Sequence, residues 1–379
     1  MNILITGIHG FVGSNLVNAL KDQHNIYGLD IVSPLKDGVI KTFSWPDLND
    51  MPMMDIIIHL AGKAHDTKNK TGSQVYFDVN TGLTQTIYDW YLTSEAKKFI
   101  FFSSVKAAAD RVAGDILTED VVPSPKGPYG ESKIAAENYI LSKEEVRGKG
   151  EEVRGKRQEV SKEEVRGKRQ EVSKEEVREA FLLPITDSQL PTTNHLLPTT
   201  DYLLPTTNYP LPTTDSSNKK TYILRPCMIH GPGNKGNLIL LYNVIKKGIP
   251  YPLGAFENRR SFTSVDNLCF VISQLIEKDI ESGIYNVGDD ESLSSNELIT
   301  LMANVMGKPD RIWKWNKSLI QLAAKVGTVL HLPLNTERLQ KLTENYVVSN
   351  AKLKHALGIK NMPVRAEDGF RKTISSIDN

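Results

Sequence analysis

The chain has 379 residues, enough to bury a substantial core in one large domain or two smaller ones. Hydrophobic residues make up 40% of it and charged residues 24%, which is ordinary for a soluble globular protein. Its formal net charge of +1 gives no overall field that would favour nucleic acid or an acidic membrane as a partner.

The sequence carries no strong signal for export or for crossing a membrane. Its N-terminus, "MNILITGIHGFVG", predicts a strand and a turn rather than a basic leader and an apolar signal core. The apolar run at 319–334 is interrupted by Lys325 and His331 and is shorter than the roughly 20 apolar residues a span needs. We expect a buried or amphipathic helix there, with membrane contact as an alternative. Cys227 and Cys269 stand in apolar surroundings, so we expect unpaired core thiols in a reducing cytoplasm rather than a disulfide.

The first 140 residues alternate apolar runs with amphipathic segments. Continuous apolar runs of this kind are typical of parallel strands buried on both faces. They are residues 2–6, 25–30, 55–61 and 98–104. Helical patterns lie between them, at residues 13–23 and 80–95. The alternation predicts a Rossmann-type, doubly wound parallel α/β sheet.

The middle of the chain, residues 144–218, consists of two kinds of repeat. "EEVRGKRQEVSK" occurs at 151–162 and again at 163–174, and Leu-Pro then recurs every seven residues as far as Pro212. The first repeat has too few apolar residues to bury a core, and prolines at this spacing exclude a helix in the second. We therefore expect a low-complexity, largely disordered insertion. A helical protrusion of the charged block and a small solenoid are the alternatives.

Globular patterning resumes after the repeats. We expect a strand at 221–226, a helix at 264–278 and a strand at 283–288, followed by a mostly helical C-terminal part. That part is expected to form a smaller lobe beside the sheet.

A glycine-rich loop follows the first expected strand. In "ITGIHGFVGSNL", Gly7, Gly10 and Gly13 stand between that strand and the start of a helix. Glycines allow the backbone to approach a pyrophosphate closely, and a helix N-terminus presents N–H groups and a positive dipole end to phosphates. The next strand ends in Asp30, whose carboxylate is placed to bind ribose hydroxyls and to repel a 2′-phosphate. The loop therefore predicts dinucleotide binding, with NAD favoured over NADP.

Three tyrosine–lysine pairs with a spacing of four residues compete as a proton-transfer dyad. They are Tyr129/Lys133, Tyr139/Lys143 and Tyr242/Lys246. The first pair follows a strand that ends in Ser103 and Ser104, at the sheet edge where ligands bind, and the other two lack this support. Residues i and i+4 are neighbours on a helix, and a lysine ammonium there lowers the tyrosine pKa so that the phenol acts as acid or base. We therefore choose Tyr129, Lys133 and a strand-end serine.

With these motifs the chain resembles an extended short-chain dehydrogenase/reductase of the NAD-dependent nucleotide-sugar epimerase/dehydratase family, similar to UDP-glucose 4-epimerases. The resemblance covers residues 1–141 and 219 to about 370. It is carried by "TGIHGFVG", "DIIIHLAG", "DVNTGLTQ", "PYGESKIAAE", "ILRPCMIHGPG" and "RRSFTSVDNL".

The resemblance implies a role for each site residue. Tyr129 would be the catalytic acid/base, Lys133 would hold the nicotinamide ribose and tune the phenol, and Ser104 would orient the sugar hydroxyl. Asn237 and Arg260 would bind the nucleotide diphosphate. The implied cofactor-binding residues are Gly7, His9, Gly10, Phe11, Val12, Gly13, Asp30, Leu60, Ala61, Gly62, Tyr129 and Lys133.

The resemblance also implies an organisation of domains and subunits. The NAD-binding domain is expected at residues 1–143, completed by segments within 219–226 and 262–280, and the substrate-binding lobe at 227–261 and 281–379. Members often dimerise through a helix pair that includes the dyad helix, which implies a homodimer. His9 and His230 have no partners at ligand spacing, so no metal is expected.

The leading hypothesis is a UDP-sugar 4-epimerase that acts through a transient 4-keto sugar. A 4-ketoreductase or dehydrogenase and a dehydratase of the same family are alternatives, and a non-catalytic NAD-binding scaffold is a further one. Asp30 favours the epimerase because reductases that consume their cofactor often prefer NADPH. Dehydratases usually carry an acid after the catalytic serine, where this chain has Val105 and Lys106.

The substrate is less closely defined by the sequence than the chemistry. The chain departs from many family members at Ala107–Ala109, which removes a polar side chain near the sugar. The C-terminal part resembles members grouped with bacterial surface-polysaccharide synthesis. We expect a role in supplying precursors for such a polymer.

Overall fold

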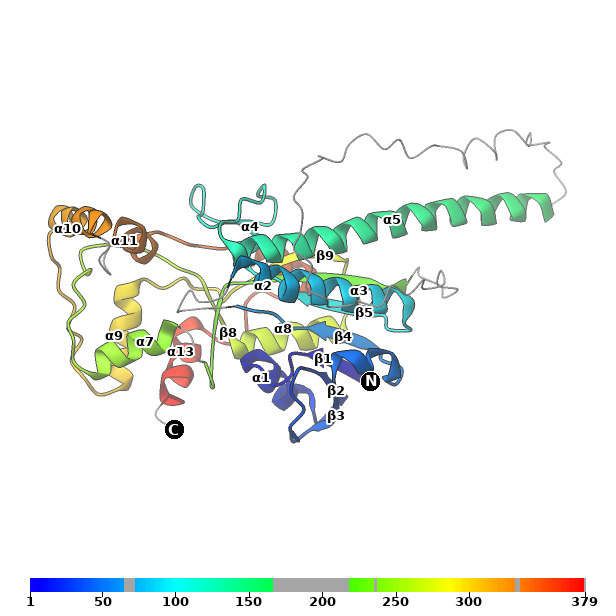
Figure 1. Cartoon of the computed structure of the whole chain (residues 1–379), viewed down its shortest axis with the longest axis horizontal. Coiled ribbons are helices and arrows are strands. Elements are labelled where there is room, and N and C mark those ends of the chain that lie inside the picture. The colour runs from blue at the N-terminus through cyan, green and yellow to red at the C-terminus, as the bar shows by residue number, and fades with distance from the viewer. Residues whose placement is uncertain (65–71, 166–217, 235–236, 331–334, 378–379) are drawn as a thin grey trace. The chain divides into compact units, whose positions relative to one another are not determined.

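The computed structural model describes residues 1–64, 72–165, 218–234, 237–330 and 335–377 (Figure 1). The chain divides into two compact units. Unit 1 comprises residues 1–143 and 214–379, and unit 2 comprises residues 144–213. The expected division of unit 1 into an NAD-binding domain and a substrate lobe stays a prediction.

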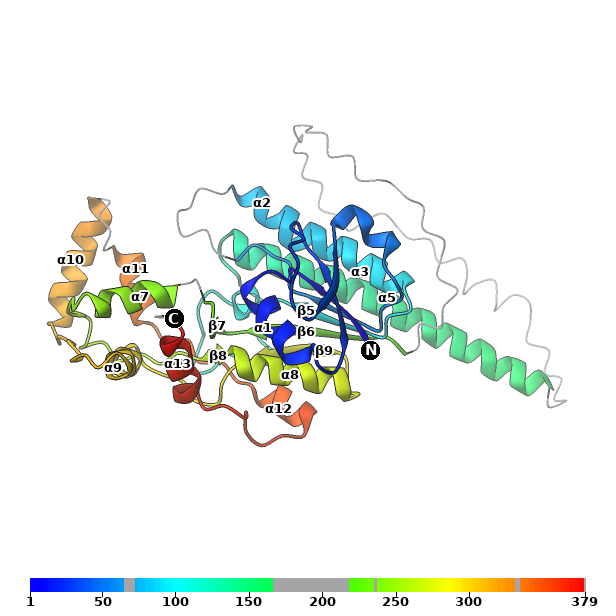
Figure 2. The same ribbon diagram turned by 90° about the horizontal axis from the view of Figure 1, so that it is seen from below.

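Unit 1 is built on a seven-stranded parallel sheet with the order β3-β2-β1-β4-β5-β6-β9 (Figure 1 and Figure 2). The strands are β1 Asn2–Thr6, β2 Asn25–Leu29, β3 Val39–Phe43, β4 Ile56–His59, β5 Lys98–Phe102, β6 Lys220–Pro226 and β9 Gly283–Val287. Two shorter strands, β7 (Met228–His230) and β8 (Phe262–Ser264), form a separate parallel pair. The strand order reverses between β1 and β4, and in open α/β sheets ligands bind outside the carboxyl ends of strands at such a switch point.

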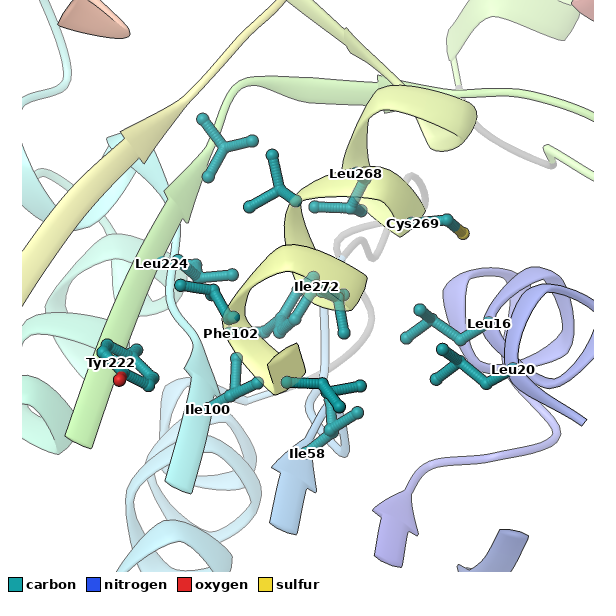
Figure 3. Close-up of a cluster of buried hydrophobic side chains, with 14 of the residues drawn as sticks. Leu16, Leu20, Ile58, Ile100, Phe102, Tyr222, Leu224, Leu268, Cys269 and Ile272 are labelled. Atoms are coloured by element: carbon teal, nitrogen blue, oxygen red, sulfur yellow. The ribbon is translucent and has the colours of Figure 1, made fainter. Parts of the chain in front are cut away.

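Helices cover both faces of the sheet. Helices α1 (Phe11–Leu20), α8 (Val265–Glu277) and α12 (Ala351–Leu357) pack on one face, and α3 (Leu83–Thr93) and α5 (Pro128–Val165) pack on the other. Ile3 and Ile5 of β1 belong to the first buried cluster, and Leu4 between them belongs to the second. Figure 3 shows the first cluster, where Leu268 and Ile272 of α8 lie between α1 and the strands. Burial on both faces is the reason that these strands read as continuous apolar runs.

The other described helices of unit 1 lie between or after these elements in the chain. They are η1 Trp45–Asp50, α2 Ser73–Phe77, η2 Asp78–Gly82, α4 Val105–Ala108, α7 Asn237–Lys246, α9 Ser295–Val305, α10 Lys317–Val329, α11 Thr336–Thr343 and α13 Ala366–Ser375. Helices α7, α9 and α13 share a buried cluster that includes Leu238, Met302 and Phe370. Helices α10 and α11 pack on each other around Ile320, Ala324 and Leu339 and stand apart from the parallel sheet (Figure 1 and Figure 2).

The expected strands are present in the parallel sheet, with ends that differ by at most two residues. Strand β3 is not predicted by the sequence, because this short edge strand mixes the exposed Ile40 and Lys41 with the buried Phe43 and so has no clear period. The helix expected at 80–95 is divided into a π-helical turn and α3. The Rossmann-type α/β class is therefore confirmed.

Helix α5 corrects one expectation, because it continues to Val165 and makes residues 144–165 helical where we expected disorder. The helical alternative describes this stretch better. Glu, Lys, Arg and Gln have high helix propensity. Arg147 also forms an ion pair with Glu144 at 2.5 Å, one turn away on the helix. These contributions to helix stability outweigh the cost of the interspersed glycines. Residues 166–217 lie outside the described residues, so disorder there stays a prediction.

Three further features concern the described part of the chain. Cys227 and Cys269 are both buried and unpaired, as expected for core thiols. None of the described helices is both long and apolar enough to cross a membrane. Within the same residues, no three or more His, Cys, Asp and Glu side chains form a group that would hold a metal ion.

We predict that replacing residues 144–213 with a short flexible linker leaves unit 1 folded. The described members of all five buried apolar clusters come from unit 1, so the deletion removes none of them. Long surface insertions also change the entropy of chain closure only slightly. Thermal unfolding of the shortened chain should give a melting temperature within a few degrees of the parent. A large fall would show that unit 2 supports the core of unit 1.

Candidate active site

The glycine loop is packed tightly between β1 and the segment after β4. Gly7 has a φ of +68°, and a Cβ built on it would lie 2.9 Å from the backbone nitrogen of Ala61. A Cβ on Gly13 would lie 2.6 Å from the carbonyl oxygen of Gly7. Both positions therefore require glycine. Phe11, Val12 and Gly13, in the first turn of α1, line the adjacent cleft and bring the positive end of the helix dipole to it.

Asp30 lies directly after β2 and is held against the glycine loop. Its carboxylate accepts hydrogen bonds from the backbone N–H groups of His9 at 3.0 Å and Ile31 at 2.7 Å. The Lys36 ammonium donates to the Ile8 carbonyl at 3.2 Å and to the Ser14 hydroxyl at 2.6 Å. Burial lowers the pKa of Lys36, and the charge of Asp30 opposes this shift. The loop and the carboxylate therefore form one rigid structure beside the cleft, although His9 and Asp30 are not among the residues that line it.

The predicted proton-transfer residues come together at the carboxyl end of β5. The Ser104 hydroxyl caps the short helix α4 and hydrogen-bonds the Tyr129 phenol. The Lys133 ammonium, 5% exposed, donates to the Phe102 carbonyl at 2.7 Å. All three side chains line the same cleft. Gly62 leaves room for Lys133, because a Cβ on Gly62 would lie 3.1 Å from the lysine Nζ.

The electrostatics of this group differ from our expectation. We expected Lys133 to lower the pKa of Tyr129, but burial dominates and raises the pKa of the phenol. The opposing influence comes from the hydrogen bond with Ser104, which lowers it. Burial also lowers the pKa of Lys133 to about 8, against the opposing charge of Glu137. The ammonium faces the Phe102 carbonyl, and this contact was not foreseeable from sequence spacing.

The two rival tyrosine–lysine pairs lie outside the cleft. The Tyr139 phenol donates to Asp89 of α3 at 2.7 Å, and Lys143 forms an ion pair with the same carboxylate at 3.2 Å. Tyr242 is buried in the cluster between α7 and α9, with the Lys246 ammonium 5.6 Å from the centre of its ring. Both pairs are explained by packing and surface charge.

A buried ion pair stands behind the proton-transfer group. Arg225 of β6 donates to Glu137 of α5 through Nε at 3.0 Å and Nη2 at 2.6 Å, and the two side chains are 2% and 0% exposed. The Ser103 hydroxyl donates to the same carboxylate. Glu137 is four residues after Lys133, so it fixes the helix turn that carries the lysine. Ser103 is thereby directed away from Tyr129, and Ser104 is the serine that pairs with it.

Asn80 connects the loop after β4 to helix α5. Its side chain accepts from the Lys63 N–H at 2.7 Å and donates to the Ser132 hydroxyl at 2.9 Å. His59 is fully buried, its ring nitrogens hydrogen-bond Thr6 at 2.7 Å and Thr84 at 3.0 Å, and burial holds its pKa well below the usual value. Leu60 and Gly62 line the cleft, whereas Ala61 packs under the glycine loop.

The opposite wall of the cleft carries charged residues. Arg260 lines it and donates to the Lys341 carbonyl, while its Nε is buried without a hydrogen-bond partner. The Lys106 ammonium lies 4.3 Å from the centre of the Tyr346 ring and donates to the Asp110 carbonyl at 2.7 Å. These groups make this wall suited to polar and anionic parts of a ligand.

Sequence analysis missed several residues of this site. Lys106, Asp110, Asn234, Glu344 and Tyr346 line the cleft but belong to no motif that we singled out. Glu137 carried a usable signal, because it lies one helical turn after Lys133. The predicted substrate ligand Asn237 begins α7, but its side chain lies outside the described part of the structure.

The cleft has a volume of about 870 Å³, in the upper part of the range for small-molecule sites. Residues 3–148 match the model of the NAD dependent epimerase/dehydratase family. This match spans less than half of the chain and includes the glycine loop, Ser104, Tyr129 and Lys133. It favours an enzyme with NAD as its cofactor, as predicted.

Two curated relatives are similar to this chain in sequence, and one solved structure is similar to it in fold. The UDP-glucose 4-epimerase of Vibrio cholerae is 25% identical across 98% of this chain and 94% of its own length. The dTDP-glucose 4,6-dehydratase of Haemophilus influenzae is 26% identical across 37% of this chain and half of its own length. The structure of UDP-glucuronic acid 4-epimerase from Bacillus cereus with NAD has a TM-score of 0.61 and 17% identity, covering 100% of this chain and 99% of that one. These relatives include an epimerase and a dehydratase, so similarity alone does not choose the reaction.

We predict that Tyr129→Phe lowers turnover of the nucleotide-sugar substrate by about 10² or more, the scale of positioned acid–base catalysis. Tyr139→Phe is the matched control, since it removes the same hydroxyl from the same helix outside the cleft. Turnover per folded molecule should be nearly unchanged in the control. Equal losses in the two variants would show that Tyr129 is not the proton-transfer residue.

Glu137→Gln should destabilise the fold by about 3 kcal/mol or more, because it leaves the Arg225 charge buried and uncompensated. The measurement is the urea midpoint at an unchanged m-value. Asp266→Asn is the control, since the Lys372–Asp266 pair is exposed and should contribute about 0.5 kcal/mol or less. A Glu137→Gln loss as small as the control's would contradict a structural role for the buried pair.

Proposed function

We propose that this enzyme is an NAD-dependent 4-epimerase of UDP-sugars. The observation that carries the proposal is the composition of one continuous cleft. It joins the glycine loop, the group of Ser104, Tyr129 and Lys133, and the charged wall around Arg260. A dinucleotide and a nucleotide sugar have to meet in such a space for C4 chemistry, and its volume is suited to two extended ligands.

The residues present fit an NAD molecule. Gly7 and Gly13 pack directly on neighbouring backbone, which a side chain would prevent, and this packing brings the first turn of α1 to the cleft, where its N–H groups would bind a pyrophosphate. The Asp30 carboxylate, fixed by two backbone N–H groups, is placed to bind ribose hydroxyls and to oppose a 2′-phosphate. Lys133 and Gly62 would border the nicotinamide half.

Residues of the chain would move one proton in each direction. NAD held by the glycine loop and Lys133 would supply the acceptor and donor of the hydride at C4 of the sugar. Tyr129 as phenolate would take the proton of the C4 hydroxyl while the C4–O bond becomes a ketone, and would return the proton to the oxygen afterwards. Ser104 would hold that oxygen by a hydrogen bond and stabilise the phenolate, since its contact already lowers the pKa of Tyr129. The net reaction inverts C4 without consuming cofactor.

The nucleotide would occupy the far part of the cleft. Arg260 lines this part of the cleft, its Nε has no hydrogen-bond partner among the described residues, and an arginine fork matches phosphate oxygens. Four further points stay predictions. They are a ligand role for Asn237, a homodimer through the helix that carries Tyr129, a cytoplasmic location and a role in surface-polysaccharide precursor synthesis. The UDP-sugar class is supported by the Vibrio cholerae relative, whose activity concerns UDP-glucose.

A 4-ketoreductase or dehydrogenase is the nearest alternative, and Asp30 disfavours it where NADPH is the reductant. A dehydratase needs a further carboxyl group near the sugar. Asp110 lies in the cleft, but its side chain is 3.4 Å from the Lys106 ammonium in an ion pair. A non-catalytic scaffold does not account for the complete set of Ser104, Tyr129 and Lys133.

Incubation of the purified enzyme with UDP-glucose, without added nicotinamide cofactor, should produce the C4 epimer UDP-galactose, using NAD retained during purification. UDP-N-acetylglucosamine and UDP-glucuronic acid should be tested in parallel, because the sugar is not fixed by the site. Proton NMR of the anomeric signals measures the product. Failure to interconvert any of these pairs, together with stoichiometric oxidation of NADH or NADPH by a 4-keto sugar, would contradict the epimerase and establish a reductase.

A further inference from the structure

Helix α10 exposes an apolar face. Leu319, Leu322, Val326 and Val329 are 66%, 59%, 48% and 76% exposed, and Leu330 at the helix end is 61% exposed. At 100° per residue these side chains and Ala323 fall within an arc of about 120°. The face is therefore a continuous apolar stripe rather than scattered surface leucines.

The same helix buries little of its apolar surface inside the protein. Ile320, Ala324 and Gly327 are its buried residues, and they pack in the cluster with Leu253 and Leu339. The stripe that faces solvent is thus wider and bulkier than the face that holds the helix to the core. Contiguous exposed apolar surface of this kind marks an interaction site.

Two exposed tryptophans directly precede α10 in the chain. Trp313 and Trp315 are 49% and 54% exposed, and their rings are stacked with centroids 6.0 Å apart. The backbone of Trp313 is fixed, because its N–H donates to the Tyr251 carbonyl at 2.8 Å and its carbonyl accepts from the Gly254 N–H at 3.0 Å. The exposed tryptophans are therefore held by a segment whose backbone is hydrogen-bonded to the rest of the protein.

The charge of this segment has a single sign. Residues 311–336 contain Arg311, Lys314, Lys317 and Lys325 and no Asp or Glu. The flanking carboxylates are already engaged: Asp310 accepts from the Thr300 hydroxyl at 2.8 Å, and Glu337 pairs with Lys341 of α11 at 2.8 Å. On the wheel of α10, Lys325 borders the apolar stripe.

We propose that α10 and the preceding tryptophan pair form an interfacial anchor that binds the surface of an anionic lipid bilayer. An amphipathic helix with Leu and Val on one side and a lysine beside them, here Lys325, lies in the plane of the headgroups, and tryptophan is suited to that depth. Anionic headgroups attract the positive charge of the segment 311–336. The apolar side chains enter the upper acyl region without crossing the membrane.

A second copy of the chain fits this surface less well. A two-fold contact places the same patch against itself, so the lysines and arginine of both copies would meet with no carboxylate from the same segment to pair with them. Interface cores are also depleted in lysine. Charge complementarity thus favours lipid headgroups over self-association.

The test is co-sedimentation of the full chain with vesicles of phosphatidylglycerol and phosphatidylcholine, compared with phosphatidylcholine alone. We expect binding to the anionic vesicles that weakens as salt rises from about 50 to about 500 mM, because screening reduces the attraction. The combined change Trp313→Ser/Leu322→Ser/Val326→Ser should lower the partition coefficient at least about tenfold. Lys314→Glu/Lys325→Glu should lower it by about fivefold or more for each reversed charge.

Matched controls lie elsewhere on the same unit. Met53→Ser alters an exposed apolar residue, and Lys352→Glu/Lys360→Glu reverses two exposed charges on and after α12, so neither should change binding. Circular dichroism and thermal unfolding confirm that each variant is folded, and the buried contacts of Ile320 and Ala324 are untouched. Absence of binding to anionic vesicles by the parent would overturn the proposal. A second result would also overturn it: the parent forms dimers in sedimentation velocity, and the variant Trp313→Ser/Leu322→Ser/Val326→Ser no longer dimerises but still binds the anionic vesicles.

Discussion

The buried ion pair between Arg225 and Glu137 is the contact on which the arrangement of the site depends. Two charges removed from water are tolerated only with close, multiple hydrogen bonds, and here the guanidinium and the Ser103 hydroxyl satisfy one carboxylate. The pair joins β6, α5 and the end of β5. It fixes the turn of α5 that carries Lys133, and it engages Ser103 so that Ser104 is left to face Tyr129. A proton-transfer group drawn from two distant segments is held in place by this one interaction.

The parallel sheet supplies the second constraint, because it brings the carboxyl ends of β1, β4, β5 and β6 to one edge. A chain of buried hydrogen bonds runs under the glycine loop there, from Thr6 through His59 to Thr84. His59 is therefore a structural residue, kept neutral by burial, and not a ligand. Its position explains how a histidine inside a cofactor motif contributes to function by fixing the loop above it.

The sequence was sufficient for the Rossmann-type class and for the position of the glycine loop after β1, of Asp30 after β2 and of Tyr129 in the cleft, because local spacing and strand-end position carry those features. The choice of Tyr129 as the proton-transfer residue stays a prediction. It did not predict β3, whose edge position gives no clear period, or the helical continuation of α5, where propensity prevails over repeat composition. The charged wall could not be predicted, since Lys106 and Tyr346 meet only through tertiary packing. For the apolar run at 319–334 the sequence predicted a buried or amphipathic helix, and α10 is amphipathic, but the overall charge of +1 did not indicate the local excess of basic residues.

The most direct test of the account is the fate of the C4 hydrogen. UDP-glucose labelled with deuterium at C4 should be converted with the label retained at C4 of the epimer, because one hydride is removed and returned within a single binding event. Mass spectrometry and deuterium NMR of the product measure both the amount and the position of the label. Retention at C4 with inverted configuration is the predicted result. Transfer of the label to C6, or its loss to added cofactor, would contradict the epimerase and indicate a dehydratase or a reductase.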